Sequence, residues 1–330
     1  MKILLVRVSS LGDVLHNLPM VADILRRHPD ALIDWVVEEG YVSLVRLNPH
    51  VQRIIPFALR RWRKSLGSRA TRAEIKDFVK ALREQQYDYV FDTQGLLKTG
   101  IIMGAARLKA GGRKVGLANG SEGSGYEGLS RIFHTLSVPL PARTHAVARG
   151  RLVAAAALGY RVDSAPDFGL PPPDAAERPG WLPPGDYAVF FHGTARNAKK
   201  WAPENWVATG RALAPMPVLL AWGSPSEQRE AEALAAQLPN AVVLPRLSMD
   251  QAVMLARFAA LAIGVDTGLT HIAAAFVRPT IELYADSPRW KTEGNWSGRI
   301  VNLGDKGAPP TVAAVLDAVQ RLRALAGGQP

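Results

Sequence analysis

The chain repeats a pattern in which an apolar stretch ends in a short polar turn and a helical pattern follows. The clearest case is 260–275, where an apolar run leads into Asp266-Thr267-Gly268 and a series of small residues begins at Leu269. The first amides of a helix have no partner within it, so such a turn predicts an anion site. Gly268 would allow a ligand close to the backbone, although Asp266 or Thr267 could also serve as an ordinary helix cap.

A second turn of this kind, Ser9-Ser10-Leu11-Gly12-Asp13, lies near the other end of the chain. Two such turns in separate half-chains predict two domains that face one cleft. We expect an N-terminal domain over 1–165, a proline-rich linker over 166–184 and a C-terminal domain over 185–330.

Apolar and helical periodicities alternate through both halves, which predicts doubly wound, Rossmann-like α/β domains with parallel sheets. Ligands bind such sheets beyond the carboxyl ends of the strands, where the polar turns lie. The predicted strands are 2–8, 31–37, 51–57, 87–91, 114–117, 187–191, 218–221, 241–244, 261–265 and 280–284. The predicted helices are 13–27 with a bend at Pro19, 71–86, 98–106, 145–158, 203–213, 226–238, 249–259, one from 269, and 310–326.

The charge balance favours an anionic partner. The 330 residues carry a formal net charge of +11 and no cysteine. Nucleic acid, a membrane surface and a phosphorylated substrate all remain open on charge alone. Disulfides and cysteine-ligated zinc are excluded, and no apolar run reaches the roughly 18 residues of a membrane span. The first residues read as a buried strand rather than a signal peptide, so a cytoplasmic location is expected.

Several motifs suggest chemistry that their context does not support. Residues 123–128 match G-x-G-x-x-G, but no clear strand precedes them, and a loop is expected there. The histidines lack zinc-ligand spacing, and no Asp-x-Asp pair is present to clamp a metal on a diphosphate. We therefore expect no metal cofactor.

Two turns of the C-terminal half offer groups for a phosphorylated ligand. The segment 191–201 follows a strand and carries Thr194, Arg196 and Lys199, although it could be a solvated basic loop. Trp222 follows another strand and could wall a base pocket or pack in the core.

Two features of the N-terminal half could serve an acceptor. Asp13 could be a helix cap or a general base. The run Arg60-Arg61-Trp62-Arg63-Lys64 could be solvated surface, a membrane-adhesion patch or, with Lys98, a phosphate pocket. Trp62 could pack beneath the run and hold it.

Taken in order, these segments resemble the ADP-heptose lipopolysaccharide heptosyltransferases of glycosyltransferase family nine. The resemblance covers nearly the whole chain and is greatest to the type I enzymes. Its motifs are 9–16, 60–64, 92–96, 199–201, 222–223 and 265–271.

The resemblance implies a GT-B fold, with the last helix, about 310–326, returning to the N-terminal domain. It implies an inverting, metal-independent transfer of heptose from ADP-L-glycero-D-manno-heptose to Kdo of Kdo2-lipid A, at the cytoplasmic face of the inner membrane and with no nucleic-acid partner. Asp13 would be the base and Lys199 would meet the diphosphate. The donor site would comprise Ser10, Gly12, Thr194, Ala195, Lys199, Trp222, Glu227, Asp266, Thr267, Gly268, Leu269 and His271. The acceptor site would comprise Arg60, Arg61, Arg63, Lys64, Lys98 and His145.

The sequence departs from the family pattern at two positions. Ala195 stands where a second threonine is expected, and Tyr126 where an arginine is expected, for which Arg131 could substitute. The alternatives are heptosyltransferase II, another GT-B enzyme such as a sugar-nucleotide epimerase, and a noncatalytic binder of nucleic acid or membrane. The arginine-rich run argues against an epimerase, which needs no anionic acceptor.

Overall fold

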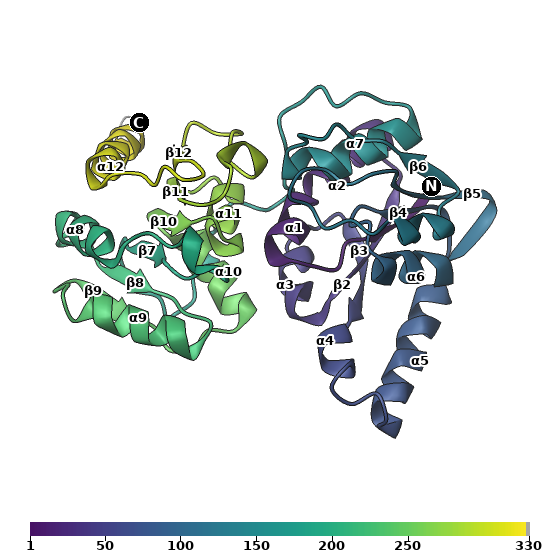
Figure 1. The fold of residues 1–330 in the computed structure, drawn as a ribbon, viewed down its shortest axis with the longest axis horizontal. Coiled ribbons are helices and arrows are strands. Elements are labelled where there is room, and N and C mark those ends of the chain that lie inside the picture. The colour runs from purple at the N-terminus through teal and green to yellow at the C-terminus, as the bar shows by residue number, and fades with distance from the viewer. Residues whose placement is uncertain (328–330) are drawn as a thin grey trace. The chain divides into compact units, whose positions relative to one another are not determined.

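The computed structural model describes residues 1–327 and divides into two compact units (Figure 1). The first is Met1–Leu170 and the second begins at Pro171. The boundary falls inside the proline-rich segment predicted as a linker. Each unit contains one six-stranded parallel sheet with helices packed on it.

The N-terminal sheet has the strand order β3-β2-β1-β4-β5-β6. Its strands are β1 (Lys2–Val6), β2 (Leu32–Glu38), β3 (Val51–Phe57), β4 (Gln86–Asp92), β5 (Arg107–Leu117) and β6 (Leu136–Val138). Its helices are α1 (Leu11–His16), α2 (Pro19–Arg27), η1 (Glu39–Tyr41), α3 (Val42–Arg46), α4 (Leu59–Trp62), α5 (Arg69–Arg83), α6 (Leu97–Ala105), η2 (Gly128–Phe133) and α7 (Ala146–Leu158).

The C-terminal sheet has the order β12-β11-β10-β7-β8-β9. Its strands are β7 (Ala188–Phe191), β8 (Val218–Leu220), β9 (Ala241–Val243), β10 (Leu261–Val265), β11 (Thr280–Tyr284) and β12 (Ile300–Gly304). Its helices are η3 (Ala175–Glu177), η4 (Asn197–Lys199), α8 (Pro203–Leu213), α9 (Pro225–Ala235), α10 (Met249–Phe258), α11 (Gly268–Ala275), η5 (Arg289–Lys291) and α12 (Val312–Gly327).

Both sheets follow the Rossmann order, in which the chain builds outward from its first strand and then crosses to that strand's other side. The reversal occurs between β1 and β4 in one unit and between β7 and β10 in the other. The central strands are apolar and buried on both faces, as β1 and β10 show, because helices cover each side of the sheet. The crevices at the carboxyl ends of these strands are therefore the places to look for sites.

The predicted helix over 13–27 is two helices. α1 ends at His16 and α2 begins at Pro19. Proline cannot donate to the preceding turn but suits the first position of a new helix. The predicted bend is therefore a break, and α1 becomes a short helix that carries Asp13.

The last helix, α12, packs within its own unit against α8, β11 and β12. Val315, Val319 and Leu322 on its apolar face belong to the core of the C-terminal unit. This apolar face is used within the C-terminal unit, and the expectation that the helix returns to the N-terminal domain stays a prediction.

Across residues 1–327, no helix combines the length and the apolar character that crossing a membrane requires.

Candidate functional site

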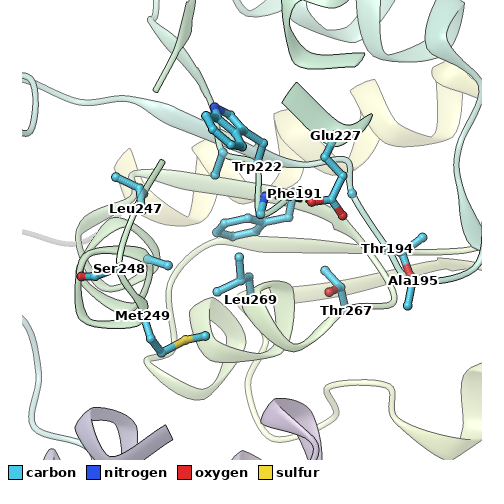
Figure 2. A pocket seen from close by; sticks show the side chains of 14 residues that line it. Phe191, Thr194, Ala195, Trp222, Glu227, Leu247, Ser248, Met249, Thr267 and Leu269 are labelled. Atoms are coloured by element: carbon cyan, nitrogen blue, oxygen red, sulfur yellow. Dashed lines mark hydrogen bonds between the residues drawn. The ribbon is translucent and has the colours of Figure 1, made fainter. Parts of the chain in front are cut away.

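A cavity of about 230 Å³ opens at the carboxyl end of the C-terminal sheet (Figure 2). It lies where β7, β8 and β10 end, beside the switch point of the sheet. Six predicted donor-site residues line it, namely Thr194, Ala195, Trp222, Glu227, Thr267 and Leu269. The other lining residues are Phe191, Gly193, Ala221, Gly223, Leu247, Ser248, Met249 and Ala252.

The cavity has apolar walls and a polar end. Phe191, Trp222, Leu247 and Met249 supply aromatic and flexible apolar surface, which suits a flat ring. The Trp222 indole is fixed because its Nε1 donates to the Leu244 carbonyl over 2.7 Å. Trp222 lines the cavity and also packs against the core of the C-terminal unit, so the base-pocket and core-packing interpretations both stay predictions.

Glu227 is held at the rim of the cavity. Its Oε2 accepts from the backbone amides of Gly223 (2.8 Å) and Ser224 (3.0 Å), at the start of α9. A Cβ at Gly193 would lie 2.6 Å from Oε1, so a larger residue there would push this carboxylate out of its place. The cap bonds leave Oε1 available for a polar group of a ligand.

The N-terminus of α11 borders the same cavity through Thr267 and Leu269. In the described structure the Thr267 side chain makes no cap hydrogen bond, although Thr267 occupies the N-cap position. The first α11 amides are therefore open to an anion, with the helix dipole favouring negative charge there. The Thr270 hydroxyl does not occupy these amides, because it donates to the Val265 carbonyl over 2.8 Å.

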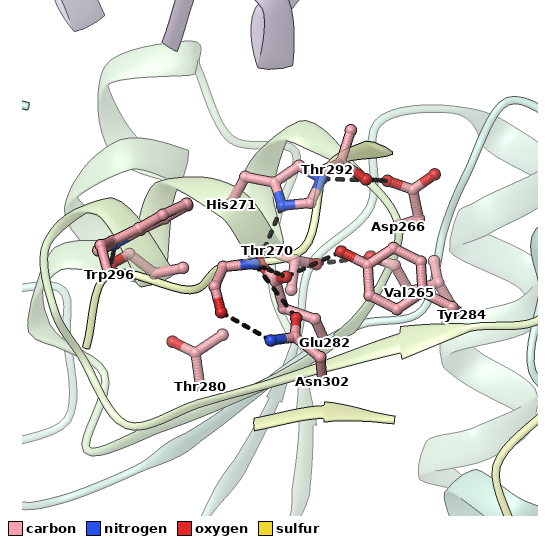
Figure 3. A network of polar contacts seen from close by, with 12 residues as sticks. Val265, Asp266, Thr270, His271, Thr280, Glu282, Tyr284, Thr292, Trp296 and Asn302 are labelled. Carbon is pink, nitrogen blue, oxygen red and sulfur yellow. Dashed lines mark hydrogen bonds and ion pairs between the residues drawn. The ribbon is translucent and has the colours of Figure 1, made fainter. Parts of the chain in front are cut away.

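A chain of ionic contacts runs behind this turn (Figure 3). Asp266 Oδ2 lies 2.5 Å from Lys199 Nζ, and Asp266 Oδ1 lies 3.1 Å from His271 Nε2. His271 Nδ1 in turn lies 2.8 Å from Glu282 Oε1 on β11. Glu282 Oε2 accepts from Tyr284 (2.9 Å) and from the Gly294 amide (2.9 Å), which completes the partners of this buried carboxylate.

The two carboxylates keep His271 protonated. Burial disfavours the imidazolium, but Glu282 and Asp266 outweigh that effect and raise the pKa of His271 to about 10. Burial also disfavours the charged form of Asp266, yet His271 and Lys199 hold its pKa well below the usual range. Both groups are therefore charged near neutral pH, and Lys199 is held next to the α11 turn by Asp266.

The first turn of the N-terminal unit forms a second polar cluster. Asp13 Oδ1 lies 2.7 Å from Arg7 NH2, and its Oδ2 accepts from the Ser10 amide (3.1 Å) and hydroxyl (2.9 Å). Arg7 is anchored from the other side because it donates to the Thr93 carbonyl. Although Asp13 is so engaged, 35% of its side chain remains exposed.

Asp13 is an ionised carboxylate. Burial favours its neutral form, but the Arg7 charge and the Ser10 hydrogen bonds hold its pKa well below the usual range. The interpretation of Asp13 as a simple cap is incomplete, since its partners include a nearly buried arginine as well as the Ser10 amide.

Arg149 is a neighbour that the sequence did not indicate. It lies on α7, is 5% exposed, and its Nε and NH2 have no hydrogen-bond partner in the described structure. Burial and Arg7 lower its pKa, while the Asp13 charge opposes them. Its place in a helix pattern of small residues gave no sign of function.

Lys98 belongs to the Asp13 side of the sheet. Its Nζ donates to Ser9 Oγ over 3.1 Å, and Gln94 Nε2 donates to the same oxygen over 3.3 Å. Burial lowers the pKa of Lys98, and the charges of Glu38 and Arg60 also act on it. The strand ends of β1 and β4 and the start of the arginine-rich run are thus brought together.

The arginine-rich run begins on the short helix α4 and divides into two kinds of cation. Arg61 is paired with Glu39 (3.1 Å) and Glu74 (2.7 Å). Arg63 and Lys64 are exposed, and the Arg60 guanidinium lies 5.7 Å from the centroid of the Tyr41 ring. Arg60, Arg63 and Lys64 are therefore the members suited to meet an anionic ligand.

Trp62 packs beneath the run. It is 5% exposed, contacts Phe57 and Phe78, and donates its Nε1 to Glu74 over 2.8 Å. The interpretation of Trp62 as a support for the loop is confirmed.

The remaining predicted residues are dispersed. His145 is the N-cap of α7, where its Nδ1 accepts from the Val147 amide over 3.2 Å. Ser10 and Gly12 lie in the Asp13 turn of the first unit, outside the cavity lining. Tyr126 donates to the Ala118 carbonyl over 2.9 Å, so it has a structural role in the loop that contains 123–127. That loop bears out the expectation that the G-x-G-x-x-G match is not a nucleotide fingerprint.

Among residues 1–327, no group of three or more histidine, cysteine, aspartate or glutamate side chains is arranged to hold a metal ion.

Comparison with known proteins gives one consistent result. The sequence model described as glycosyltransferase family 9 (heptosyltransferase) matches residues 75–315. The lipopolysaccharide heptosyltransferase 1 of Pseudomonas aeruginosa is 39% identical over 287 residues, which is 86% of this chain and 78% of that protein.

Two solved structures of the Escherichia coli heptosyltransferase WaaC, each 33% identical, are also similar. The structure with ADP has a TM-score of 0.83 and covers 98% of this chain and 100% of that one. The structure with ADP-2-deoxy-2-fluoro heptose has a TM-score of 0.78 and covers 97% and 99%. These matches confirm the predicted fold class, and the chain belongs to glycosyltransferase family 9, the heptosyltransferases.

Proposed function

We propose that this protein transfers L-glycero-D-manno-heptose from ADP-heptose to a Kdo hydroxyl of Kdo2-lipid A, with inversion and without a metal ion. The observation that carries the proposal is the cavity at the C-terminal switch point, which combines an aromatic wall with the open N-terminus of α11. Similar structures contain ADP and an ADP-heptose analogue.

In this proposal the adenine lies against Trp222 and Phe191, and Glu227 meets the ribose. The diphosphate lies at the α11 amides, with Thr194 and Lys199 as further donors. Lys199 Nζ has three N–H bonds, so it can stay paired with Asp266 while it donates to a phosphate. The backbone amide of Ala195 supplies what the expected threonine would have supplied.

Asp13 is the proposed base. The acceptor oxygen attacks the anomeric carbon of heptose as the bond to the β-phosphate oxygen breaks, ADP leaves with the bonding electrons, and the hydroxyl proton passes to Asp13. A carboxylate with a low pKa is a weak base, so the proton moves late, once bond formation has made the hydroxyl acidic. The proposal requires Asp13 and the bound donor to meet at the anomeric carbon during turnover.

Arg60, Arg63, Lys64, Lys98 and His145 are the proposed acceptor contacts. Arginine pairs well with carboxylate and phosphate oxygens, which are the anionic groups of a Kdo-containing lipid head group. Arg61 contributes by positioning the run through Glu39 and Glu74. With such an acceptor the protein would work as a peripheral protein at the cytoplasmic face of the inner membrane.

The test is to incubate the protein with ADP-heptose and Kdo2-lipid A in the presence of EDTA and to weigh the lipid product. The expected result is the mass of one added heptose and an equal amount of ADP. Absence of transfer that Mg²⁺ restores would refute the metal-independent mechanism. Transfer only to an acceptor that already carries heptose would assign the protein as a heptosyltransferase II.

A further inference from the structure

Two elements of the N-terminal unit expose large apolar side chains together. Leu97 and Ile101 on α6 are 36% and 53% exposed, and Leu129 and Ile132 on η2 are 67% and 73% exposed. We name these four side chains the α6–η2 patch. They are four of the ten large hydrophobic side chains that are exposed in the described structure. Single exposed leucines are normal on a protein surface, whereas a group of them indicates an interaction site.

The patch is one surface because α6 and η2 pack directly on each other. A Cβ at Gly100 would lie 2.8 Å from the Phe133 ring and 3.2 Å from Ser130, and one at Gly104 would lie 2.6 Å from Phe133. These glycines let the two elements touch along one side of α6. Leu97 and Ile101, four residues apart, share another face of that helix, and Leu129 and Ile132, three apart, share the outer face of η2.

Three cations lie in or beside the two elements that carry the patch. Arg131 lies exposed between Leu129 and Ile132 in the sequence of η2. At the C-terminus of α6, Lys114 donates to the Gly104 carbonyl (2.8 Å) and Arg83 to the Ala105 carbonyl (3.2 Å). The acid nearest the patch in sequence, Glu127, accepts from the Leu97 amide over 2.6 Å and so caps α6.

We propose that the α6–η2 patch is the surface by which this protein docks on an anionic phospholipid bilayer. Apolar side chains with cations beside them match an interface whose head groups are negative and whose acyl chains lie just below. A second copy of this chain is the poorer occupant, because it would bring the same cations together. This choice of partner rests on the proposed lipid acceptor.

The position of the patch supports the choice. α6 also carries Lys98, whose Nζ reaches Ser9 beside the Asp13 turn. One short helix therefore presents a cation to the proposed acceptor site and apolar side chains to solvent. Docking through α6 would hold the acceptor site next to the surface in which the lipid acceptor is embedded.

The test is flotation of the substrate-free protein with vesicles of phosphatidylethanolamine and phosphatidylglycerol, and with vesicles of phosphatidylcholine alone. The patch variant carries Ile101→Glu, Leu129→Glu and Ile132→Glu. The control variant carries Trp181→Glu, Val242→Glu and Leu325→Glu, which change net charge equally at side chains 39%, 50% and 49% exposed in the C-terminal unit. All six sites are exposed, and thermal melting verifies that both variants fold.

We expect the wild type to bind anionic vesicles more tightly than phosphatidylcholine vesicles. The patch variant should bind anionic vesicles about tenfold more weakly or worse, since losing one buried leucine-sized side chain already corresponds to that factor. The vesicle affinity of the control variant should stay within about twofold of the wild type. Its added charges lie outside the patch and act on the vesicle only through long-range repulsion, which salt screens.

Equal vesicle binding by the patch and control variants would overturn the inference. It would also be overturned if sedimentation showed a wild-type dimer that the patch variant cannot form while vesicle binding stayed equal, since the patch would then join two copies. Because the assay contains no substrate, it is independent of the proposed reaction. The patch variant should transfer heptose normally to O-deacylated, micelle-free acceptor. If the wild type itself does not transfer heptose to this acceptor, the result would count against the proposed function and not against the docking surface.

Discussion

Asp13 and Asp266 each follow a central strand of a six-stranded sheet, yet their environments differ. Asp13 lies in the first turn of α1, and Asp266 lies in the loop between β10 and α11. Asp266 is 9% exposed and bonded to Lys199, His271 and Thr292. Asp13 is 35% exposed and bonded to Arg7 and Ser10. Both have a pKa below the usual range, so ionisation does not distinguish them. Solvent exposure distinguishes them: the Asp13 carboxylate is open enough to contact a substrate, whereas the Asp266 carboxylate is enclosed by the side chains that it holds in place.

The largest expected effect is the loss of turnover when the accessible carboxylate, Asp13, is removed. Asp13→Ala should lower kcat by about 10²–10⁴, as for a lost general base. Steady-state rates with ADP-heptose and Kdo2-lipid A measure it, and circular dichroism verifies folding. A folded variant with near-normal kcat would reduce Asp13 to a helix cap.

The next effect concerns stability, and it falls on the Asp266 side. Glu282→Gln should lower the free energy of unfolding by about 3–5 kcal/mol, because it leaves the buried His271 imidazolium with one carboxylate fewer. Denaturant unfolding measures this change. Asn302→Ala is a control in the same region, where the Asn302 side chain bonds to the backbone of Gly294. A smaller loss for Glu282→Gln than for this control would contradict the charged network.

The arginine-rich run offers a comparison inside the proposed acceptor site. Combined replacement of Arg60, Arg63 and Lys64 by Gln should raise KM for O-deacylated acceptor by about tenfold or more. Arg61→Gln should change it by less than about fivefold, since exposed ion pairs contribute at most about 1 kcal/mol. If Arg61→Gln matched the triple variant, Arg61 would be an acceptor contact after all.

A further effect is a pH dependence of stability. The pKa of His271 is raised above its unfolded value to about 10, so its contribution is fully present below about pH 6.5 and is lost as pH rises toward 10. The free energy of unfolding of the wild type should therefore decline over this interval more steeply than that of His271→Gln. Parallel pH profiles for the two proteins would show that the imidazole is not charged in the folded state.

The sequence predicted the two doubly wound sheets and most of their elements, because apolar runs and helical periodicity are strong signals in buried parallel strands. It missed β12, whose residues Asn302 and Gly304 interrupt the apolar run, and α4, which is one turn long and lacks a cap residue. It also missed the short elements β6 and α3. It predicted one helix with a bend at Pro19, where the structure has two separate helices, α1 and α2. Such short elements are set by packing that local patterns do not encode.

The candidate site was predicted where it depends on turns after strands. Thr194, Trp222, Glu227 and Thr267 line one cavity as expected. Leu247 and Met249 were missed although Ser248 and Gln251 form a capping box that marks a strand-to-helix turn there. Arg7 and Arg149 were missed because a cation within an apolar strand or a small-residue helix carries no signal until the fold brings it to Asp13.

The central claim is that the C-terminal cavity binds the donor nucleotide independently of the Asp13 turn. Calorimetric titration of ADP into the wild type, Asp13→Ala and Lys199→Ala in the presence of EDTA tests it most directly. We predict that Asp13→Ala keeps the wild-type Kd within about twofold, whereas Lys199→Ala raises Kd by about tenfold, as for one lost charge-assisted contact. Loss of ADP binding in Asp13→Ala, or unchanged binding in Lys199→Ala, would contradict the claim.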